Sequence, residues 1–200
     1  LVFGLLLACA CRLSFQGRLR ANPSSHSVIN YIAHHNGFTL ADLVSYDRKH
    51  NDENGQQGMD GVDVNHSWNC GEEGPTRKKA VLSLRKRQRK NALMMVFFSQ
   101  GIPMLLAGDE LGNSQGGNNN AYCHDSRLSW VDWSLKRREH GFTEFVKDLI
   151  TFRKEHEILH MSESLYGSDV NSYGYPDISF HGSDAWYGSL DPMNHHIASM

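Results

Sequence analysis

Residues 28 to 33, VINYIA, form the first clear hydrophobic run, in which β-branched and aromatic residues dominate. This pattern predicts a strand that is buried on both faces, as strands of parallel sheets are. His34, His35 and Asn36 follow at once, and a glycine then lets the backbone turn before Thr39 begins a short helix. We therefore expect a strand that ends in polar side chains and leads into a helix.

A second unit repeats this pattern further along the chain. Helical spacing predicts a helix from Thr76, as its N-cap, to about Gln100. Residues 104 to 108, MLLAG, then predict a second buried strand, which ends in Asp109 and Glu110. Two successive strand and helix units imply parallel strands. Neighbouring residues in an extended chain point to opposite faces, so we expect the two acids to brace the loop by hydrogen bonds rather than to act on one bond together.

The predicted helix has an apolar face and a basic face. The core face is Val81, Leu84, Gln88, Ala92 and Met95, and the basic run is Arg77, Lys78, Lys79, Arg85, Lys86, Arg87, Arg89 and Lys90. We expect the basic run to be a solvated outer face, because the interleaved aromatic residues and overall positive charge of nucleic-acid binders are absent. The net charge of −2 gives no electrostatic reason to expect nucleic acid or an anionic membrane as a partner.

Two long polar loops, residues 47 to 74 and 112 to 125, separate these elements. A loop of the first length in a compact domain is either disordered or functional. Trp68 argues against simple disorder, and its indole could stack on a sugar face. The alternative is that Trp68 only pins the loop. We expect Tyr122 and Cys123 to anchor the second loop.

The residues near both ends of the chain predict elements other than the two strand and helix units. The first 13 residues predict the end of a buried helix that starts upstream, so we expect a fragment of a longer protein. Near the other end, Phe142 to Ile150 predict one more helix, and residues 177 to 187 predict a small antiparallel β region. The four cysteines show neither a metal-binding spacing nor a disulfide framework, which favours free thiols in a reducing compartment.

Several motifs together closely resemble one branch of a known superfamily. HHNGFTLADLVSYDRKHN, NHSWNCGEEG, SQGIPMLLAGDE, GNNNAYC and SWVDW are similar to the glycogen-debranching and isoamylase-type glycoside hydrolases of the α-amylase superfamily. The resemblance runs from about Ile29 to beyond Trp186. It implies a fold of class α/β: residues 1–157 would be the C-terminal part of a catalytic (β/α)₈ TIM barrel, with strands seven and eight and their helices. Residues 158–200 would begin an antiparallel β-sandwich domain. A complete barrel needs about 250 residues, so we expect its first six strands to be missing.

The resemblance also implies an activity and its residues. Such enzymes hydrolyse α-1,6 branch linkages of glycogen and related α-glucans with retention, in glycogen catabolism. The nucleophile and the general acid belong to strands four and five, so this chain alone is expected to be inactive. A third carboxylate lies in a His-Asp-Gly-Phe motif, and Asn36 occupies its place here. His35 matches the histidine that binds the glucose at the cleavage site, and the candidate glucan contacts are Trp68, Asn118, Asn119 and Asn120. We expect an α-glucan partner, a cytoplasmic location, no metal and no cofactor.

Asn36 is the main departure from the pattern of these enzymes. A fixed negative charge stabilises the oxocarbenium character of the breaking bond, and an amide supplies none. Losing one such group typically costs about 10²–10³ in turnover. Three explanations stay open: a weakened or non-catalytic α-glucan-binding homologue, a sequencing error, or an Asn-Gly site that deamidates to Asp.

Overall fold

The computed structural model describes residues 17, 19–22, 27–181, 186 and 198–199. Its strands are β1 (Ile29–Asn30), β2 (Ile102–Pro103), β3 (Phe180–His181) and β4 (Ala198–Ser199), and its α-helices are α3 (Leu40–Leu43), α4 (Lys79–Phe98), α5 (Leu135–Arg138) and α6 (His140–Glu155). Short 3₁₀ turns cover Asp52–Asn54, Asp109–Leu111, Ala121–Cys123 and Glu157–Leu159. The helix predicted for the first 13 residues lies outside the described residues.

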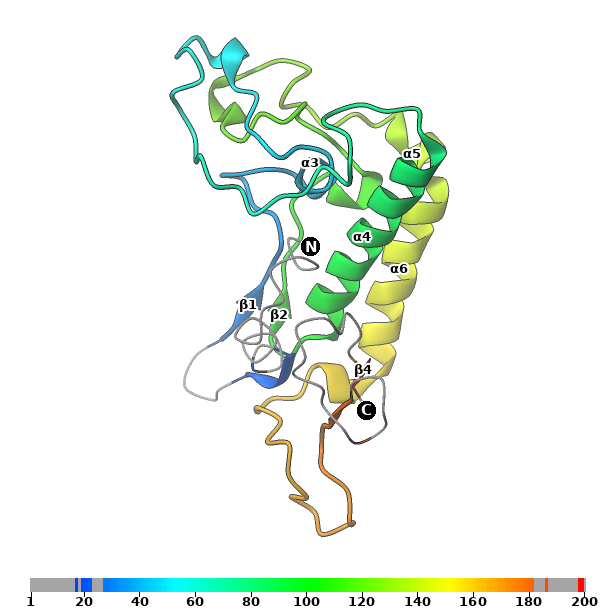
Figure 1. Cartoon of the computed structure of the whole chain (residues 1–200). Coiled ribbons are helices and arrows are strands. Elements are labelled where there is room, and N and C mark those ends of the chain that lie inside the picture. Colours follow the sequence, from blue (N-terminus) through cyan, green and yellow to red (C-terminus); the bar gives the residue numbers. More distant parts are fainter. Residues whose placement is uncertain (1–16, 18, 23–26, 182–185, 187–197, 200) are drawn as a thin grey trace.

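β1 and β2 pair in parallel, with Ile29 opposite Ile102. The long helices α4 and α6 pack against each other and run alongside the strands (Figure 1). The carboxyl ends of both strands lead to the same end of the molecule, where the long polar loops gather, while residues 156–181 lie at the opposite end. The predicted parallel pair of strand and helix units is therefore confirmed.

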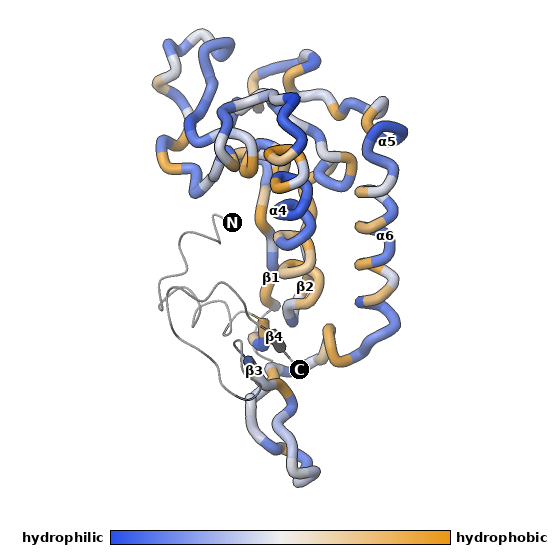
Figure 2. Tube along the Cα trace, turned by 45° about the vertical axis from the view of Figure 1, so that its right-hand side comes forward, coloured by the Kyte–Doolittle hydropathy of each residue, from blue (hydrophilic) through white to orange (hydrophobic). Residues whose placement is uncertain are grey.

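The core lies between the strands and the two long helices. Its buried members are Leu40, Ala92, Leu93, Phe97, Phe142, Val146 and Leu149, and Ile32, Met94, Phe98, Leu105, Phe145 and Ile150 pack against them. Figure 2 shows this concentration of hydrophobic residues along the strands and the facing part of α4. The apolar faces predicted for the two helices are largely confirmed, since Gln88, Ala92, Phe142, Val146 and Leu149 are all buried.

The prediction that the first strand is buried on both faces is wrong. Ile29 and Tyr31 are 52% and 49% exposed, whereas Asn30 and Ala33 are buried. The physical reason is that, among the described residues, β1 pairs with β2 alone and the long helices lie on one side of the pair. Ile29 therefore stays exposed, and Tyr31, whose ring contacts that of His34, is covered only in part. The alternation of exposed and buried residues follows from this one-sided packing.

The boundaries of the second unit also differ from the prediction. The helix begins at Lys79 without a side-chain cap, and the predicted cap Thr76 lies outside it. Instead, the Thr76 hydroxyl donates to Glu72 and accepts from the backbone N–H of Lys78 at 3.1 Å. The strand lies at Ile102–Pro103 rather than at residues 104 to 108. The hydrogen bonds to β1 fix this position: the amide of Ile102 donates to the carbonyl of Val28, and the amide of Met104 donates to the carbonyl of Asn30.

β3 and β4 pair in antiparallel fashion, as predicted for a small β region beyond residue 156. Of the predicted AWY segment, only Trp186 lies within the described residues. Gln100 ties this end to the core, because its side chain donates to the carbonyl of Ile158 at 2.6 Å and accepts from the amide of Met161 at 2.9 Å. The predicted domain boundary between residues 157 and 158 stays a prediction.

Candidate functional site

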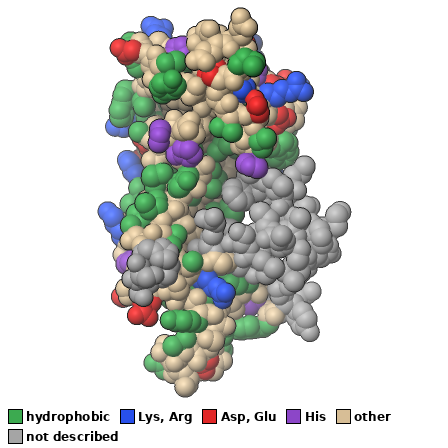
Figure 3. All heavy atoms as spheres, turned by 90° about the vertical axis from the view of Figure 1, so that its left-hand side faces the viewer, with side chains coloured by type: hydrophobic (Ala, Val, Ile, Leu, Met, Phe, Trp, Pro, Cys, Tyr) green, Lys and Arg blue, Asp and Glu red, His purple; other side chains and the backbone are tan. Residues whose placement is uncertain are grey.

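The turn after β1 presents polar side chains to solvent. His35 and Asn36 are exposed, and among the described residues no group hydrogen-bonds to either side chain. The ring of His34 packs edge-on against Tyr31 and accepts a hydrogen bond of 3.2 Å from the amide of Asn36. Histidine side chains reach the surface on the face where β1 lies, above a group of hydrophobic side chains (Figure 3). Asn36 thus lies in the turn that follows β1, but not directly after the strand as predicted, because β1 ends at Asn30. The roles predicted for His35 and Asn36 stay predictions.

Two buried carboxylates join this turn to the segment after β2. Asp109, which is 3% exposed, accepts a hydrogen bond of 2.9 Å from the amide of Leu40 at the start of α3. In the other direction Asp42, which is fully buried, accepts from the hydroxyl of Ser114 at 2.5 Å and from the amide of Gln115 at 2.8 Å. Each unit therefore donates to a carboxylate of the other.

Burial changes the acidity of both carboxylates. Loss of solvation raises the pKa of Asp109 to about 7, against the opposing effect of the Leu40 amide; the negative charges of Glu110 and Asp42 raise it further. Burial also raises the pKa of Asp42, although Ser114 and the amide of Gln115 stabilise its charged form. The predicted bracing role of Asp109 and Glu110 is confirmed, since Glu110 accepts from the amide of Gly108 at 2.9 Å.

The last part of the first polar loop, residues 68 to 74, returns to the chain at the end of α3 and is hydrogen-bonded there. The amide of Trp68 donates to the carbonyl of Leu43 at 2.9 Å, and the amide of Gly74 donates to the carbonyl of Ser45 at 2.8 Å. Trp68 is half-buried, so it covers part of the loop and also keeps an exposed edge. The two interpretations of Trp68, a glucan platform and a structural pin, stay open.

Arg85 in α4 holds residues 69 to 74 of this loop by hydrogen bonds. Its side chain is buried, and its guanidinium donates to the carbonyl oxygens of Gly74 at 2.7 Å, of Asn69 at 3.0 Å and of Glu72. The prediction that the whole basic run is a solvated face is therefore wrong at Arg85. The physical reason is that the loop turns its carbonyl groups toward α4, and a guanidinium can satisfy several of them at once.

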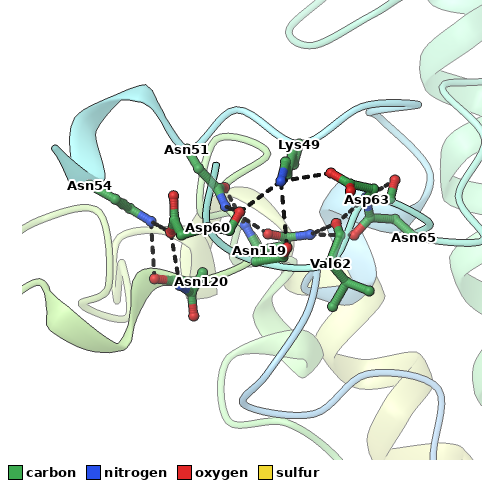
Figure 4. Close-up of polar contacts among 10 residues, drawn as sticks. Lys49, Asn51, Asn54, Asp60, Val62, Asp63, Asn65, Asn119 and Asn120 are labelled. Atoms are coloured by element: carbon green, nitrogen blue, oxygen red, sulfur yellow. Dashed lines mark hydrogen bonds and ion pairs between the residues drawn. The ribbon is translucent and has the colours of Figure 1, made fainter. Parts of the chain in front are cut away.

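The two polar loops are joined by a network of asparagine side chains (Figure 4). Asn119 exchanges two hydrogen bonds with Asn51: its backbone amide donates at 3.0 Å and its side-chain oxygen accepts at 2.8 Å. Its side-chain nitrogen donates to the carbonyl of Val62 at 2.7 Å and to Asn65 at 2.6 Å. Asn119 is 1% exposed. All of its side-chain polar atoms are thus engaged within the protein.

The other two asparagines of the predicted set join the same network. Asn118, also 1% exposed, donates to Asn54 at 2.6 Å, and Asn120 donates to Asp60 at 2.8 Å. Hydrogen bonds from Asn54 and Asn120 hold the pKa of Asp60 below its usual range. The glucan contact predicted for Asn118, Asn119 and Asn120 stays a prediction, since the network engages their side chains with the loops themselves.

The predicted anchors of the second loop are wrong. Tyr122 is 79% exposed and Cys123 is an exposed free thiol, whereas the buried residue of that turn is Ala121. The loop is held instead by the asparagine network and by the hydrogen bond of 2.7 Å from the amide of His50 to the carbonyl of Gly117. Polar residues typical of turns thus do the anchoring that the aromatic residue was expected to do.

The structure brings together residues that the sequence singled out separately and adds others. The turn at His35 and Asn36 and the loop of Trp68 lie at the same end of the molecule, and α3 connects them. Asp42 and Arg85 were missed as linking residues. In the part of the chain that the structure describes, no group of three or more histidine, cysteine or acidic residues could hold a metal ion. None of the described helices has the length and apolar character to span a membrane.

Known proteins share much of this sequence. The "Glycogen operon protein GlgX homolog" of Mycobacterium tuberculosis is 46% identical over 144 residues, which are 72% of this chain and 20% of that protein. "Isoamylase 1, chloroplastic" of Arabidopsis thaliana is 48% identical over 136 residues, 68% of this chain and 17% of that protein. The chain thus spans about one fifth of the length of the curated relatives it matches. No protein-family profile matches it.

Solved structures share the fold. Pullulanase from Anoxybacillus sp. LM18-11, in a complex with maltotetraose, superposes with a TM-score of 0.55 over 80% of this chain and 20% of that one, at 22% sequence identity. At this identity the likeness concerns the fold alone. It supports the assignment of the chain as a partial α/β unit.

Proposed function

The chain belongs by sequence to the family of glycogen operon protein GlgX and the isoamylases, of whose length it spans about one fifth, and from this premise we propose that it is part of an α-glucan-debranching glycoside hydrolase. In this proposal β1 and β2 are strands seven and eight of a (β/α)₈ barrel. The observation that carries it is the pair of parallel strands whose carboxyl ends meet at one end of the molecule, where barrel enzymes place their chemistry. Residues 158–200 would begin the β-sandwich domain.

The proposed reaction is hydrolysis of α-1,6-glucosidic branch linkages with retention. The nucleophile and the general acid come from strands four and five of the barrel, outside this chain. His35 would hydrogen-bond the glucose at the cleavage site, and Asn36 would occupy the position of the third carboxylate. Both side chains are exposed and have no hydrogen-bond partner among the described residues, so they are free to bind a sugar.

The surrounding loops would form the wall of the glucan site. Trp68 keeps an exposed edge for stacking on a sugar ring. Asn118 and Asn119 would act by holding the loops in place, and Asn120, which is half-buried, is the member of the set best placed to reach a hydroxyl group. The partner would be glycogen, a limit dextrin or a similar branched α-glucan. A cytoplasmic location stays a proposal, since the relatives include chloroplastic isoamylases.

The experiment uses the complete gene product that contains this chain. It is incubated with glycogen and, as the matched control, with a linear maltooligosaccharide, and the released linear chains are measured. We expect chain release from glycogen alone, because the proposed site cleaves branch linkages. Cleavage of the linear substrate at the same rate would contradict the assignment.

A second function is favoured by one residue. Asn36 supplies no charge where a carboxylate is expected, which is the signature of a non-catalytic α-glucan-binding homologue with a degenerate site. In that case glycogen in the gel would slow the migration of the gene product in affinity electrophoresis, but the gene product would release no linear chains from glycogen. The residues that end strands four and five separate the two functions: an aspartate and a glutamate there support the enzyme, and their replacement supports the binding protein.

A further inference from the structure

The turn that carries His35 and Asn36 is attached at both of its ends. On one side it continues directly from β1, and on the other it enters α3, whose first amide donates to Asp109 at 2.9 Å. We infer that Asp109 is a positioning residue for this turn, acting through Leu40 rather than by contact with substrate. This inference rests on the proposed function of His35 and Asn36.

The exposed tip of the turn depends on these attachments, because its own contacts are few. The amide of Asn36 donates to the ring of His34, and the first packed side chain after the tip is Phe38, which is buried against Tyr46. Gly37 adopts φ +151°, a conformation that other residues rarely adopt, and lies between Asn36 and the helix. In the described part of the chain, no group hydrogen-bonds the side chains of His35 or Asn36. Their location therefore follows from where the strand ends and where α3 begins. Asp109 fixes the second of these two points.

A second set of hydrogen bonds, opposite in direction to the bond between Leu40 and Asp109, also holds α3 in place. Asp42 in α3 accepts from the hydroxyl of Ser114 and the amide of Gln115, so α3 cannot shift relative to the segment after β2 without breaking buried hydrogen bonds. A buried donor that loses its partner destabilises the folded state, because the group is no longer solvated by water either. The two carboxylates thus make the position of α3, and with it the turn, a property of both units.

Asp109 is the acid suited to this role, and its neighbour is not. Among the described residues, the side chain of Glu110 accepts a hydrogen bond from the amide of Gly108 alone, two residues away in its own turn, and bonds to no group of α3. The charged groups that act on Asp109 are Glu110 from its own segment, Asp42 from α3 and Arg89 from α4. Arg89 is itself paired with Glu139 at 3.0 Å, so in the part of the chain that the structure describes no cation forms an ion pair with Asp109.

The test compares Asp109→Ala and Asp109→Asn with Glu110→Gln as the matched control, in the complete gene product. Hydrogen exchange of residues 34 to 44 reports the position of the turn, and kcat and KM on glycogen report its use. For Asp109→Ala we expect exchange of this segment to rise about tenfold or more and kcat to fall by a similar factor, since the Leu40 amide loses its acceptor. Asp109→Asn keeps an acceptor oxygen, and Glu110→Gln leaves α3 untouched, so both should stay within about twofold of the wild type.

Each outcome separates positioning from mere stability and from the proposed function. If Asp109→Ala does not fold, Asp109→Asn still decides, because it keeps an acceptor oxygen for the Leu40 amide, and exchange at residues 34 to 44 should stay within about twofold of the wild type. Unchanged exchange at residues 34 to 44 in Asp109→Ala, or a tenfold rise of that exchange in Asp109→Asn, would overturn the inference. If the wild type releases no chains while Asp109→Ala still exposes the turn, the proposed function fails and the positioning role stands.

Discussion

Arg153 in α6 donates a hydrogen bond of 2.6 Å to the carbonyl oxygen of Phe97, in the last turn of α4. The same guanidinium donates to the carbonyls of Ser99 at 2.8 Å and Gly101 at 2.6 Å. The last carbonyls of a helix have no partner within it, and a cation there also opposes the negative end of the helix dipole. α6 therefore completes the end of α4 and fixes the path of the chain into β2.

Replacing this guanidinium should destabilise the fold. In Arg153→Met the side chain keeps much of its volume but leaves three carbonyls without a donor, so we expect a loss of about 2–4 kcal/mol in the free energy of unfolding. Thermal or urea denaturation measures it. The matched control is Arg138→Met, because Arg138 is exposed and its ion pair with Asp132 is 3.6 Å long; its effect should stay within about 0.5 kcal/mol. Equal losses for the two variants would contradict the role of Arg153.

Gly101 is required by the close approach of the two strands. A Cβ atom there would lie 2.5 Å from the carbonyl oxygen of Val28, and its φ of +88° disfavours any other residue. We expect Gly101→Ala to lower stability by about 1–3 kcal/mol or more. A Cβ atom added at Gly141, in α6, would meet no atom within 4 Å beyond its own helix, so Gly141→Ala should instead raise stability by about 0.5–1 kcal/mol. A tolerated alanine at residue 101 would mean that β1 and β2 lie further apart.

The stability of the protein should depend on the ionisation of Asp109. Its pKa is about 7 in the folded state and near 3.8 in the unfolded chain, so the folded state holds a proton that the unfolded state has lost between these values. Stability therefore falls as the pH rises from about 4 to 7 and changes no further above that range. Asp109→Asn should remove this contribution, so that the Tm of the variant gains on that of the wild type across the same window. A residual slope is expected from Asp42, whose pKa is also raised. A parallel pair of Tm curves would show that Asp109 titrates normally.

The asparagine network should control the order of the two polar loops. Asn119→Ala removes the acceptor of the Asn51 side-chain nitrogen and the donor to the carbonyl of Val62, while the backbone amide of residue 119 still donates to Asn51. We expect a loss of about 1–3 kcal/mol in the free energy of unfolding together with faster proteolysis within residues 49 to 65. Limited proteolysis followed by mass spectrometry locates the cuts. Gln56→Ala, at an exposed site in the same loop, is the control and should leave the cleavage pattern unchanged. Faster cleavage outside the two loops would assign Asn119 a wider role.

Asn36→Asp should restore a charge at the proposed cleavage site. If the gene product is a weakened enzyme, we expect debranching of glycogen to rise by about 10²–10³, because a preorganised negative charge stabilises the oxocarbenium character of the transition state. The assay is the release of linear chains at fixed enzyme concentration. Mass spectrometry of the peptide around residue 36 in the wild type serves as the control for spontaneous deamidation. No change in rate for a fully aspartate-containing enzyme would argue against the role given to this position.

Local patterns predicted the parts of the fold that depend on neighbouring residues. Thr39 was expected to begin the helix after the first strand, and its hydroxyl accepts from the amide of Asp42 at 3.2 Å. The parallel pairing of the strands and the core faces of the long helices were also correct, because each follows from the spacing of apolar residues. The same reasoning placed His35 and Asn36 after the first strand, where the turn lies, although β1 ends earlier, at Asn30.

What the sequence could not show depends on groups that are far apart along the chain. Arg85 is buried because carbonyl groups of the first polar loop point toward it, and the spacing of residues along the chain does not predict the direction of those groups. Asn119 is hydrogen-bonded to Asn51, which lies 68 positions away in the sequence. Likewise Ile29 reads as a buried strand residue, but its exposure depends on which elements pack against the sheet. Polar residues in loops thus gave the least reliable predictions, since their partners are set by tertiary structure.

The mutual hydrogen bonding of Asp42 and Asp109 with the opposite segments has a consequence for protein engineering. A loop graft that brings residues 108 to 115 from a relative into this chain, or the reverse, would separate the donors of each segment from the carboxylates of the other. Residues 39 to 42 must therefore travel with that segment in any chimera. Recombination points placed between the two segments should yield poorly folded hybrids even when each parent folds well.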